Sequence, residues 1–417
     1  MKKISSILYV SLILILFLTG CGVNKGAKGT IELEFWTLQL DSFRPYITNV
    51  ISQYEKENPD IKIKWVDIPF SEGEKRTLAS VMSNNTPDLV NLNPDFSATL
   101  ATRKALVDIK TLAQPEDLEK YIPQTIDNLS YGEVVFGIPW YLTTSVTYYN
   151  KKILNAANLT EKDLPQNYFD LKHFAEKIRQ NSNVYALMPT VCEGGNMLKI
   201  FNKYNSLIYK PEGLDFNNAE NIKILELYKY LYQNDLIPKE SITQGHREAL
   251  EQFMSSQSVI LISGTNFLNS IKENSPEVYS NLGIYEQLKG NNGKSDFSMM
   301  NLIIPIKSKH PKEALKFALF LTNAKNQLEF AKLAPVFPSQ KEALKDEYFS
   351  SNSDSLDKQI RRIGAQQLNH SVAPIKIQQN HALLNEIINR TVQQVLLNQT
   401  PASKALADAQ KEWLGLQ

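Results

Sequence analysis

The sequence predicts an exported α/β protein whose folded body contains two domains. Residues 7–18 form an almost unbroken apolar run close to the N-terminus. Beyond this run, apolar residues recur first with a strand period and then with a helix period, in alternation. About 390 residues of ordinary hydrophobicity follow the run, which is enough chain for two hydrophobic cores. Alternation of strands and helices indicates α/β sheets rather than a helical bundle or a sandwich.

The N-terminal segment has the features of an export signal. Lys2 and Lys3 precede the apolar run, which is too short to span a bilayer as a helix but suits the core of a signal peptide. Residues 1–20 are therefore predicted to be removed. Without these two lysines, 43 of the 45 basic side chains remain against 44 acidic ones. A body so close to neutrality offers no electrostatic surface for nucleic acid.

The four residues at the junction between this segment and the rest of the chain predict a lipid anchor. Leu18-Thr19-Gly20-Cys21 resembles the lipobox of bacterial lipoproteins, in which the cysteine is diacylated and becomes the first residue after cleavage. Residues 21–29, rich in glycine and lysine, would then form a flexible leash. The alternative is an ordinary secretory signal in which Cys21 is incidental. Cys192 is the only cysteine of the body, so no internal disulfide is expected.

The first part of the body begins with strand, helix, strand. Residues 31–36 alternate apolar and polar side chains, as a strand with one apolar face does. Helical spacing then begins near Pro45 and is stopped by Asn58-Pro59. Residues 61–65 alternate again, and residues 88–92 form a third predicted strand after a proline turn. This order indicates an α/β sheet.

Both periodicities return further along the chain. Helical spacing covers residues 171–178 and 224–231, and apolar residues at the same spacing predict a buried stripe over residues 383–395. Strand patterns cover residues 258–262 and 301–306. The sequence contains no fixed-period repeat, and its one low-complexity cluster, at residues 350–355, is expected to form an exposed loop.

A search for catalytic and metal-binding patterns finds no convincing site. The five histidines have no metal-ligand spacing, and Cys192 has no histidine nearby in sequence to activate it. Residues 290–295 contain Gly-Lys-Ser, but Leu288 stands where a phosphate loop needs its first glycine, so an exposed turn is expected. No carboxylate pair stands out as glycosidase machinery. No metal or cofactor is therefore predicted.

Several short strings occur in a fixed order along the body, and each is weak alone. They are Asn58-Pro59-Asp60-Ile61-Lys62-Ile63, Thr86-Pro87-Asp88-Leu89-Val90, residues 105–109, Gly137-Ile138-Pro139, Tyr148-Tyr149-Asn150-Lys151, Ser263-Gly264 and residues 311–322. Together, from about residue 30 to the C-terminal part, they resemble the extracellular solute-binding proteins of ABC importers, the large family that includes maltose-binding and other sugar-binding proteins.

The resemblance implies two α/β lobes joined by crossing hinge segments, with a ligand cleft between the lobes. By analogy, residues 30–141 plus 285–322 form the N-lobe, and residues 142–284 plus 323–417 form the C-lobe. It also implies a monomer without enzymatic activity that captures a carbohydrate-like solute and delivers it to the permease subunits of an importer.

Ligands of open α/β sheets bind beyond the carboxyl ends of the strands. Trp36 ends the first strand on the side away from its apolar face, so its ring is a candidate stacking surface for a sugar. Trp65 lies on the apolar side of its strand and is expected in the core. Gln39, just after the first strand, is a weaker polar candidate.

Asn93 and Asp95 follow the third strand, where sugar-binding relatives carry a carboxylate that accepts hydrogen bonds from hydroxyls. The alternative for Asp95 is a turn-forming or helix-capping role. Trp140 and Tyr141 lie at the first crossing, and one of them is expected to contact the ligand while the other wedges the hinge.

The chain departs from the family pattern at Gly264-Thr265-Asn266-Phe267, where many relatives carry a tryptophan. Asn266 cannot stack on a sugar, and the aromatic platform of this lobe is lost unless Phe267 turns inward. The ligand is then smaller or more polar than a maltodextrin, or is held mainly by hydrogen bonds. Two alternatives remain: the same fold binding a polyamine, phosphate ester or other polar solute, and a secreted hydrolase.

Overall fold

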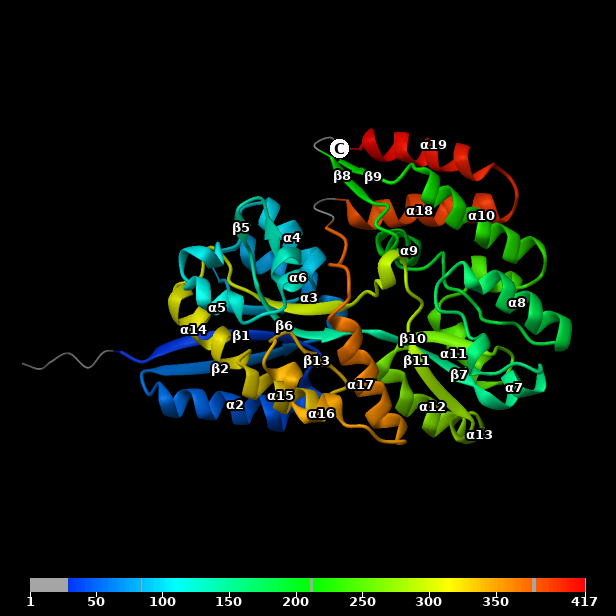
Figure 1. Ribbon diagram of the computed structural model, residues 1–417. Coiled ribbons are helices and arrows are strands. Elements are labelled where there is room, and N and C mark those ends of the chain that lie inside the picture. The colour runs from blue at the N-terminus through cyan, green and yellow to red at the C-terminus, as the bar shows by residue number, and fades with distance from the viewer. Residues whose placement is uncertain (1–28, 84, 211–212, 377–379, 417) are drawn as a thin grey trace, which may run out of the picture.

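The protein folds into two α/β lobes, each built on its own sheet (Figure 1). The computed structural model describes residues 29–83, 85–210, 213–376 and 380–416. A six-stranded sheet forms the lobe that contains the first strands of the chain, and a three-stranded sheet forms the other. The predicted two-lobed α/β architecture is confirmed.

The first sheet is mixed. Its strands are β1 (Ile31–Leu38), β2 (Ile61–Ile68), β3 (Leu89–Leu92), β6 (Ile138–Thr143), β12 (Ser298–Ile303) and β13 (Phe337–Pro338), in the order β13-β6-β12-β3-β1-β2. Strand β1 pairs in parallel with β2 and β3, whereas β12 runs antiparallel to β3 and β6. The strands predicted over residues 31–36, 61–65 and 88–92 are confirmed, and the first two continue two or three residues beyond their predicted ends. The strand predicted over residues 301–306 is present as β12, three residues earlier at both ends.

Helices cover both faces of this sheet. On one face α2 (Arg44–Glu57), α14 (Pro311–Leu321) and α15 (Ala324–Leu333) pack on Leu33 and Phe35 of β1. On the other face α3 (Phe70–Met82) and α4 (Pro94–Thr102) pack near Trp36 and Leu38 of the same strand. The C-terminal half of β1 is therefore buried on both sides.

The second lobe is organised around strand β7 (Ser145–Asn150), which pairs antiparallel with β10 (Ile260–Gly264) and β11 (Leu282–Glu286). Alternate residues of β7 face opposite ways, as a strand requires. Tyr148 faces a core formed with α11 (His246–Met254), α12 (Leu268–Asn274) and α13 (Pro276–Ser280).

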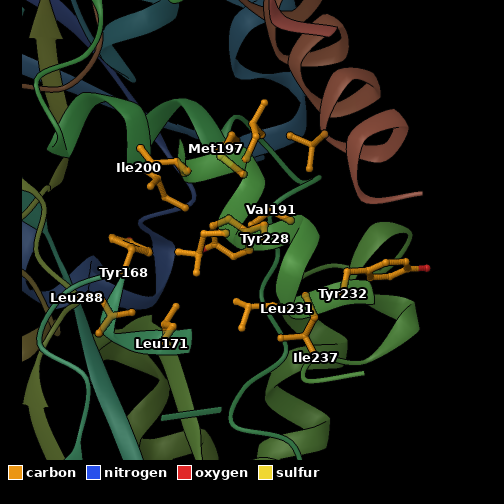
Figure 2. Close-up of a cluster of buried hydrophobic side chains, with 14 of the residues drawn as sticks. Tyr168, Leu171, Val191, Met197, Ile200, Tyr228, Leu231, Tyr232, Ile237 and Leu288 are labelled. Atoms are coloured by element: carbon orange, nitrogen blue, oxygen red, sulfur yellow. The ribbon is translucent and has the colours of Figure 1, made fainter. Parts of the chain in front are cut away.

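Tyr149 faces the larger core of this lobe. The helices around this core are α7 (Lys151–Ala156), α8 (Asp170–Asn181), α9 (Asn196–Lys203), α10 (Ala219–Gln233), α18 (His381–Leu396) and α19 (Ala402–Leu414). Figure 2 shows Leu171 of α8, Met197 of α9 and Leu231 of α10 pointing into it. Among the described residues, no helix is both long and apolar enough to cross a membrane.

Short elements complete the two lobes. The first lobe adds α5 (Pro115–Glu119), α6 (Pro123–Asn128) and the hairpin of β4 (Ser130–Tyr131) with β5 (Val134–Val135). The second adds the hairpin of β8 (Ile208–Lys210) with β9 (Gly213–Asp215). Helix α16 (Glu347–Ser350) precedes α17 (Leu356–Leu368), which lies between the two lobes in Figure 1.

Three parts of the chain connect the lobes. The chain passes from the first sheet to the second at Thr144, between β6 and β7, and returns between β11 and β12. Helix α17 contributes Ile360 and Ile363 to a core of the second lobe, and Ala365 and Leu368 to a core of the first. This helix therefore packs on both lobes.

One segment lies in a different lobe from that expected. The predicted boundaries assign residues 323–417 to the second lobe, but α15 and β13 pack against the first sheet. The Phe330 ring of α15 stacks on Trp140 with ring centroids 5.8 Å apart, and Phe337 of β13 pairs with Leu142 of β6. Aromatic packing thus keeps this segment with the first core.

The segment 290–295 is only partly the exposed turn that was expected. Ser295 is 1% exposed, and its hydroxyl donates to the Gln367 carbonyl at 2.9 Å. Gly290 lies against the backbone of α9, where an added Cβ would stand 2.1 Å from the Lys203 carbonyl oxygen. The glycine is required here by close approach of two chain segments, not by a phosphate.

Candidate functional site

A cavity of about 600 Å³ lies where the second lobe meets the crossing segments and the edge of the first lobe. This volume is typical of sites for small molecules. Its walls combine aromatic and aliphatic side chains with polar ones. The aromatic lining residues are Tyr168, Tyr228, Phe267 and Phe297, and the ionisable ones are Glu193, Lys199, Lys203, His246 and Asp296, together with the two tyrosines.

One face of helix α9 forms a wall of the cavity. Asn196, Lys199, Ile200 and Lys203 line it, with the spacing of three and four residues that places side chains on one helix face. The helix begins after Gly195, which has a φ of 73° and on which an added Cβ would stand 2.4 Å from Asn385 Oδ1 of α18. The glycine lets α9 start directly against α18, so the polar face of α9 is turned to the cavity.

The Lys203 ammonium is buried where the cavity meets the crossings. The residue is 3% exposed, and its Nζ donates to Gln287 Oε1 at 2.5 Å, to Tyr168 Oη at 3.1 Å and to the Leu288 carbonyl at 3.2 Å. Asp296 Oδ1 lies 3.4 Å from the same nitrogen. Burial lowers the pKa of Lys203, and the Asp296 carboxylate opposes this shift.

The partners of Lys203 join the crossing segments to one another. Gln287 Nε2 donates to Thr144 Oγ1 at 3.0 Å and to the Asp296 carbonyl at 2.9 Å. Gln367 of α17 accepts a hydrogen bond through Oε1 from the backbone amide of Gln287 at 2.6 Å, and its Nε2 donates to the Ser145 carbonyl at 3.0 Å. We call Lys203, Thr144, Gln287, Asp296 and Gln367 the hinge cluster. It links α9 with all three connections between the lobes.

His246 forms a second polar group in the cavity wall. Its Nε2 lies 2.8 Å from Ser263 Oγ, and its ring lies against Phe267 with centroids 4.6 Å apart. Glu193 Oε2 accepts from the His246 backbone amide at 2.8 Å. Burial lowers the pKa of His246, and the charge of Glu193 partly opposes the shift.

The structure brings two of the predicted site residues together in this cavity. Asn266 and Phe267 form a 3₁₀ turn after β10, and both line the wall. Phe267 is half-buried and turned inward, which was the condition for an aromatic surface on this lobe.

The predicted residues of the first lobe do not line this cavity. Trp36 is 8% exposed, and its Nε1 donates to Glu34 Oε1 at 2.6 Å. Gln39 is exposed, with a φ of 54°. Tyr141 is half-buried and packs edge-on against Trp140. Solute contact by Trp36, Gln39 and Tyr141 stays a prediction.

Trp140 is the clearest departure from expectation. It is 0% exposed and lies in the first core between Phe35 and Phe330, on the same face as Ile138. A side chain without exposed surface has none to offer a solute. Sequence position near the crossing suggested a role in the cleft, but the helices on this face of β6 cover the ring completely.

Asn93 caps the start of helix α4, and Asp95 connects this helix to the other lobe. Asn93 is the N-cap of α4, accepting from the Phe96 amide at 2.8 Å and donating to Glu74 Oε1 at 2.9 Å. Asp95 Oδ2 lies 3.1 Å from His381 Nδ1 at the start of α18. Their contact with a solute stays a prediction.

Most residues of the cavity wall were missed by sequence reasoning. Thr190, Glu193, Asn196 and His246 come from loops and helix starts that carry no strand-end signal. The helical spacing of Asn196, Lys199 and Lys203 was visible, but in an isolated sequence it equally describes a solvated face. Only the fold shows that this face is turned to a cavity.

Of the two cysteines in the sequence, the structure describes Cys192 but not Cys21. Cys192 is half-buried and packs against the larger core of the second lobe, where burial raises the pKa of its thiol to about 12. A thiol with such a pKa is almost wholly protonated at neutral pH and is a poor nucleophile. Cys21 lies outside the described residues.

Two α/β lobes joined by crossing segments, with a solute-sized cavity where they meet, define a binding protein of the two-lobed class. The model of the family described as bacterial extracellular solute-binding protein matches residues 39–328. The chain belongs to this family.

Relatives and solved structures agree with this assignment. The galactooligosaccharide-binding protein of Bacillus subtilis strain 168 is 24% identical over 343 residues, which cover 78% of each chain. The crystal structure of a periplasmic-binding protein from Synechococcus sp. MITs9220 is 31% identical, with a TM-score of 0.84 over 92% of this chain and 98% of that one. The sugar-binding protein MalE from Xanthomonas citri, 20% identical over 91% of this chain and 96% of that one, shares the fold with a TM-score of 0.76.

Replacing Lys203 with methionine should destabilise the protein by about 3 kcal/mol, because the partly buried Asp296 carboxylate and the buried side-chain oxygen of Gln287 lose their cation. The midpoint of thermal unfolding is then expected to fall by several degrees. Lys199→Met, an exposed lysine one turn earlier on the same helix face, is the matched control and should shift the midpoint by less than about 1 °C. Equal midpoints for the two variants would contradict a stabilising role of the hinge cluster.

The lowered pKa of His246 predicts a loss of stability on acidification. Below pH 6.5, the ordinary pKa of histidine, the unfolded chain binds a proton that the folded protein binds only at lower pH. Stability from this group is thus present above pH 6.5 and is lost as the pH falls towards the lowered pKa. Thermal unfolding at pH 7.5 and pH 5.5 should show a smaller pH-dependent drop for His246→Gln than for the wild type. The same drop in both would exclude His246 as the source.

Proposed function

We propose that the protein captures a hydroxyl-rich solute of the sugar class for an ABC importer. The observation that carries the proposal is the cavity, in which two cationic side chains, Lys199 and Lys203, are balanced by Glu193 and Asp296. Such a site combines many hydrogen-bonding groups with little net charge. Aromatic side chains add surfaces against which the CH-rich faces of a sugar ring pack.

The charge balance disfavours the two other ligand classes. A polyamine needs an excess of carboxylates, and a phosphate ester needs an excess of cations or free backbone donors. Relatives named for sugars support the same conclusion, among them the galactooligosaccharide-binding protein. Another relative, the sn-glycerol-3-phosphate-binding protein UgpB of Escherichia coli, is 20% identical over 61% of this chain, so phosphate esters belong in any ligand panel.

The protein is proposed to act by binding alone. Ser263 and His246 are hydrogen-bonded like two members of a hydrolytic triad, but the described residues supply no hydrogen-bond acceptor for His246 Nδ1. Without a group that orients the imidazole, the pair lacks the arrangement of a nucleophile and its base. Closure of the lobes on the solute and docking on separate permease subunits, as a monomer, complete the proposal.

Binding is tested by thermal unfolding of the chain against neutral mono- and disaccharides, polyamines and phosphate esters. A ligand at 100 times its dissociation constant stabilises the folded state by roughly 2.7 kcal/mol. We expect only sugars to raise the midpoint, and Phe267→Ala to weaken the binding of the active sugar about tenfold, or 1.4 kcal/mol.

Tyr279→Ala is the control, since Tyr279 is a half-buried aromatic residue of the same core that does not line the cavity. It should leave the affinity unchanged. Stabilisation by a polyamine, or by a phosphate ester that carries no sugar, instead of a sugar would refute the ligand class. Release of products from a bound sugar would refute the non-enzymatic role.

We also propose that Cys21 carries the lipid that holds the exported protein at the membrane. The support is the string Leu18-Thr19-Gly20-Cys21 after the apolar run. Cys21→Ser should move the protein from the membrane fraction to the soluble fraction and abolish labelling by radioactive palmitate. Cys192→Ser, the matched control, should change neither. Retention of Cys21→Ser at the membrane would favour an anchor other than a lipid on this cysteine.

A further inference from the structure

A second, smaller cavity adjoins the first. It has a volume of about 170 Å³ and lies where the turn Thr265–Phe267 of the second lobe faces the end of α15 and residues 334–337 of the first. Thr265 Oγ1 donates to the Pro335 carbonyl at 3.5 Å, which links the lobes at this point. Asn266 lines both cavities. The Asn266 side chain therefore lies between the two cavities, which are on either side of the turn Thr265–Phe267.

The second cavity carries an excess of positive charge. Lys332 of α15 and Arg361 of α17 line it, and Asp357 is the one carboxylate among its lining residues. The first cavity, in contrast, has equal numbers of carboxylates and amines. A solute that reaches both compartments thus meets a balanced site at one end and a cationic site at the other.

The two cations are held in place but are not neutralised. Arg361 Cζ lies 4.3 Å from the centroid of the Tyr348 ring, and Lys332 Nζ lies 5.8 Å from it. Within the described parts of the chain, neither side chain lies within ion-pair distance of a carboxylate, and Arg361 Nε is buried without an acceptor. Contact with an aromatic face orients a guanidinium while leaving its N–H donors free.

We propose that this second cavity binds an oxyanion, namely a carboxylate, sulfate or phosphate carried by the solute whose sugar ring occupies the first cavity. The inference rests on the proposed sugar-binding function and makes it more specific. A guanidinium presents a planar set of donors that matches an oxyanion, and a charge-assisted hydrogen bond is stronger than one between neutral groups. An acidic sugar would also contact Lys332 of the first lobe and Asn266 of the second at once.

The test is calorimetric titration of the full chain with matched disaccharides. The probes are a neutral disaccharide, the disaccharide of the same linkage with a terminal glucuronic acid, and its 6-phosphate and 6-sulfate esters. We expect at least one acidic member to bind tenfold or more tightly than the neutral one. The preference should shrink between 0.15 M and 1 M salt, because part of this cationic surface is exposed.

Two variants assign the preference to this cavity. Arg361→Gln should abolish the preference for the acidic disaccharide and leave the affinity for the neutral one unchanged. Arg362→Gln, its neighbour on α17 that does not line the cavity, should retain the preference. Lys332→Gln, at an exposed position, gives a second measurement that does not depend on the folding of the Arg361 variant.

The outcomes separate this inference from the function on which it rests. Binding of the neutral disaccharide without any preference for its acidic forms would overturn the oxyanion site and leave the sugar-binding function intact. The same holds if the preference survives in both Arg361→Gln and Lys332→Gln. Silence towards every disaccharide, neutral and acidic, would count against the proposed function itself.

Discussion

The buried ammonium of Lys203 is the interaction on which the relation between the two lobes depends. A charge that is 3% exposed is stable only when its hydrogen bonds are complete, and its partners lie in the segments that connect the lobes. The same side chain lines the larger cavity. The cavity wall and the hydrogen bonds of the hinge cluster therefore share one nitrogen atom, and a movement of the crossing segments would change the hydrogen bonds that this atom offers to the cavity.

The fold was largely predictable because its signals are local. Periods of two and of three to four residues marked the early strands and helices, and short strings in a fixed order indicated the family. The lobe of α15 was not predictable, since it depends on the contact of Phe330 with Trp140, about 190 residues away in sequence. Periodicity identifies a helix, whereas the sheet that receives it is decided by packing between distant residues.

The candidate site was less predictable than the fold for a physical reason. Strand ends beyond a sheet can be located from a pattern, and that rule selected Trp36 and Asp95. The cavity is lined instead by a helix face and by loops such as that of Glu193. The role of these side chains can be recognised only from the residues that surround them in the fold. Asn266 and Phe267 were predicted as site residues because they follow Gly264, at a place where many relatives carry a tryptophan.

Helix α17 couples the two lobes, because it packs on a core of each. Its residues Ile360 and Ile363 belong to one core, and Ala365 and Leu368 belong to the other. Loss of either core would strip apolar neighbours from this helix and so weaken the remaining one. We therefore expect the two lobes to unfold together, and a solute bound to one of them would then also protect the backbone of the other against proteolysis.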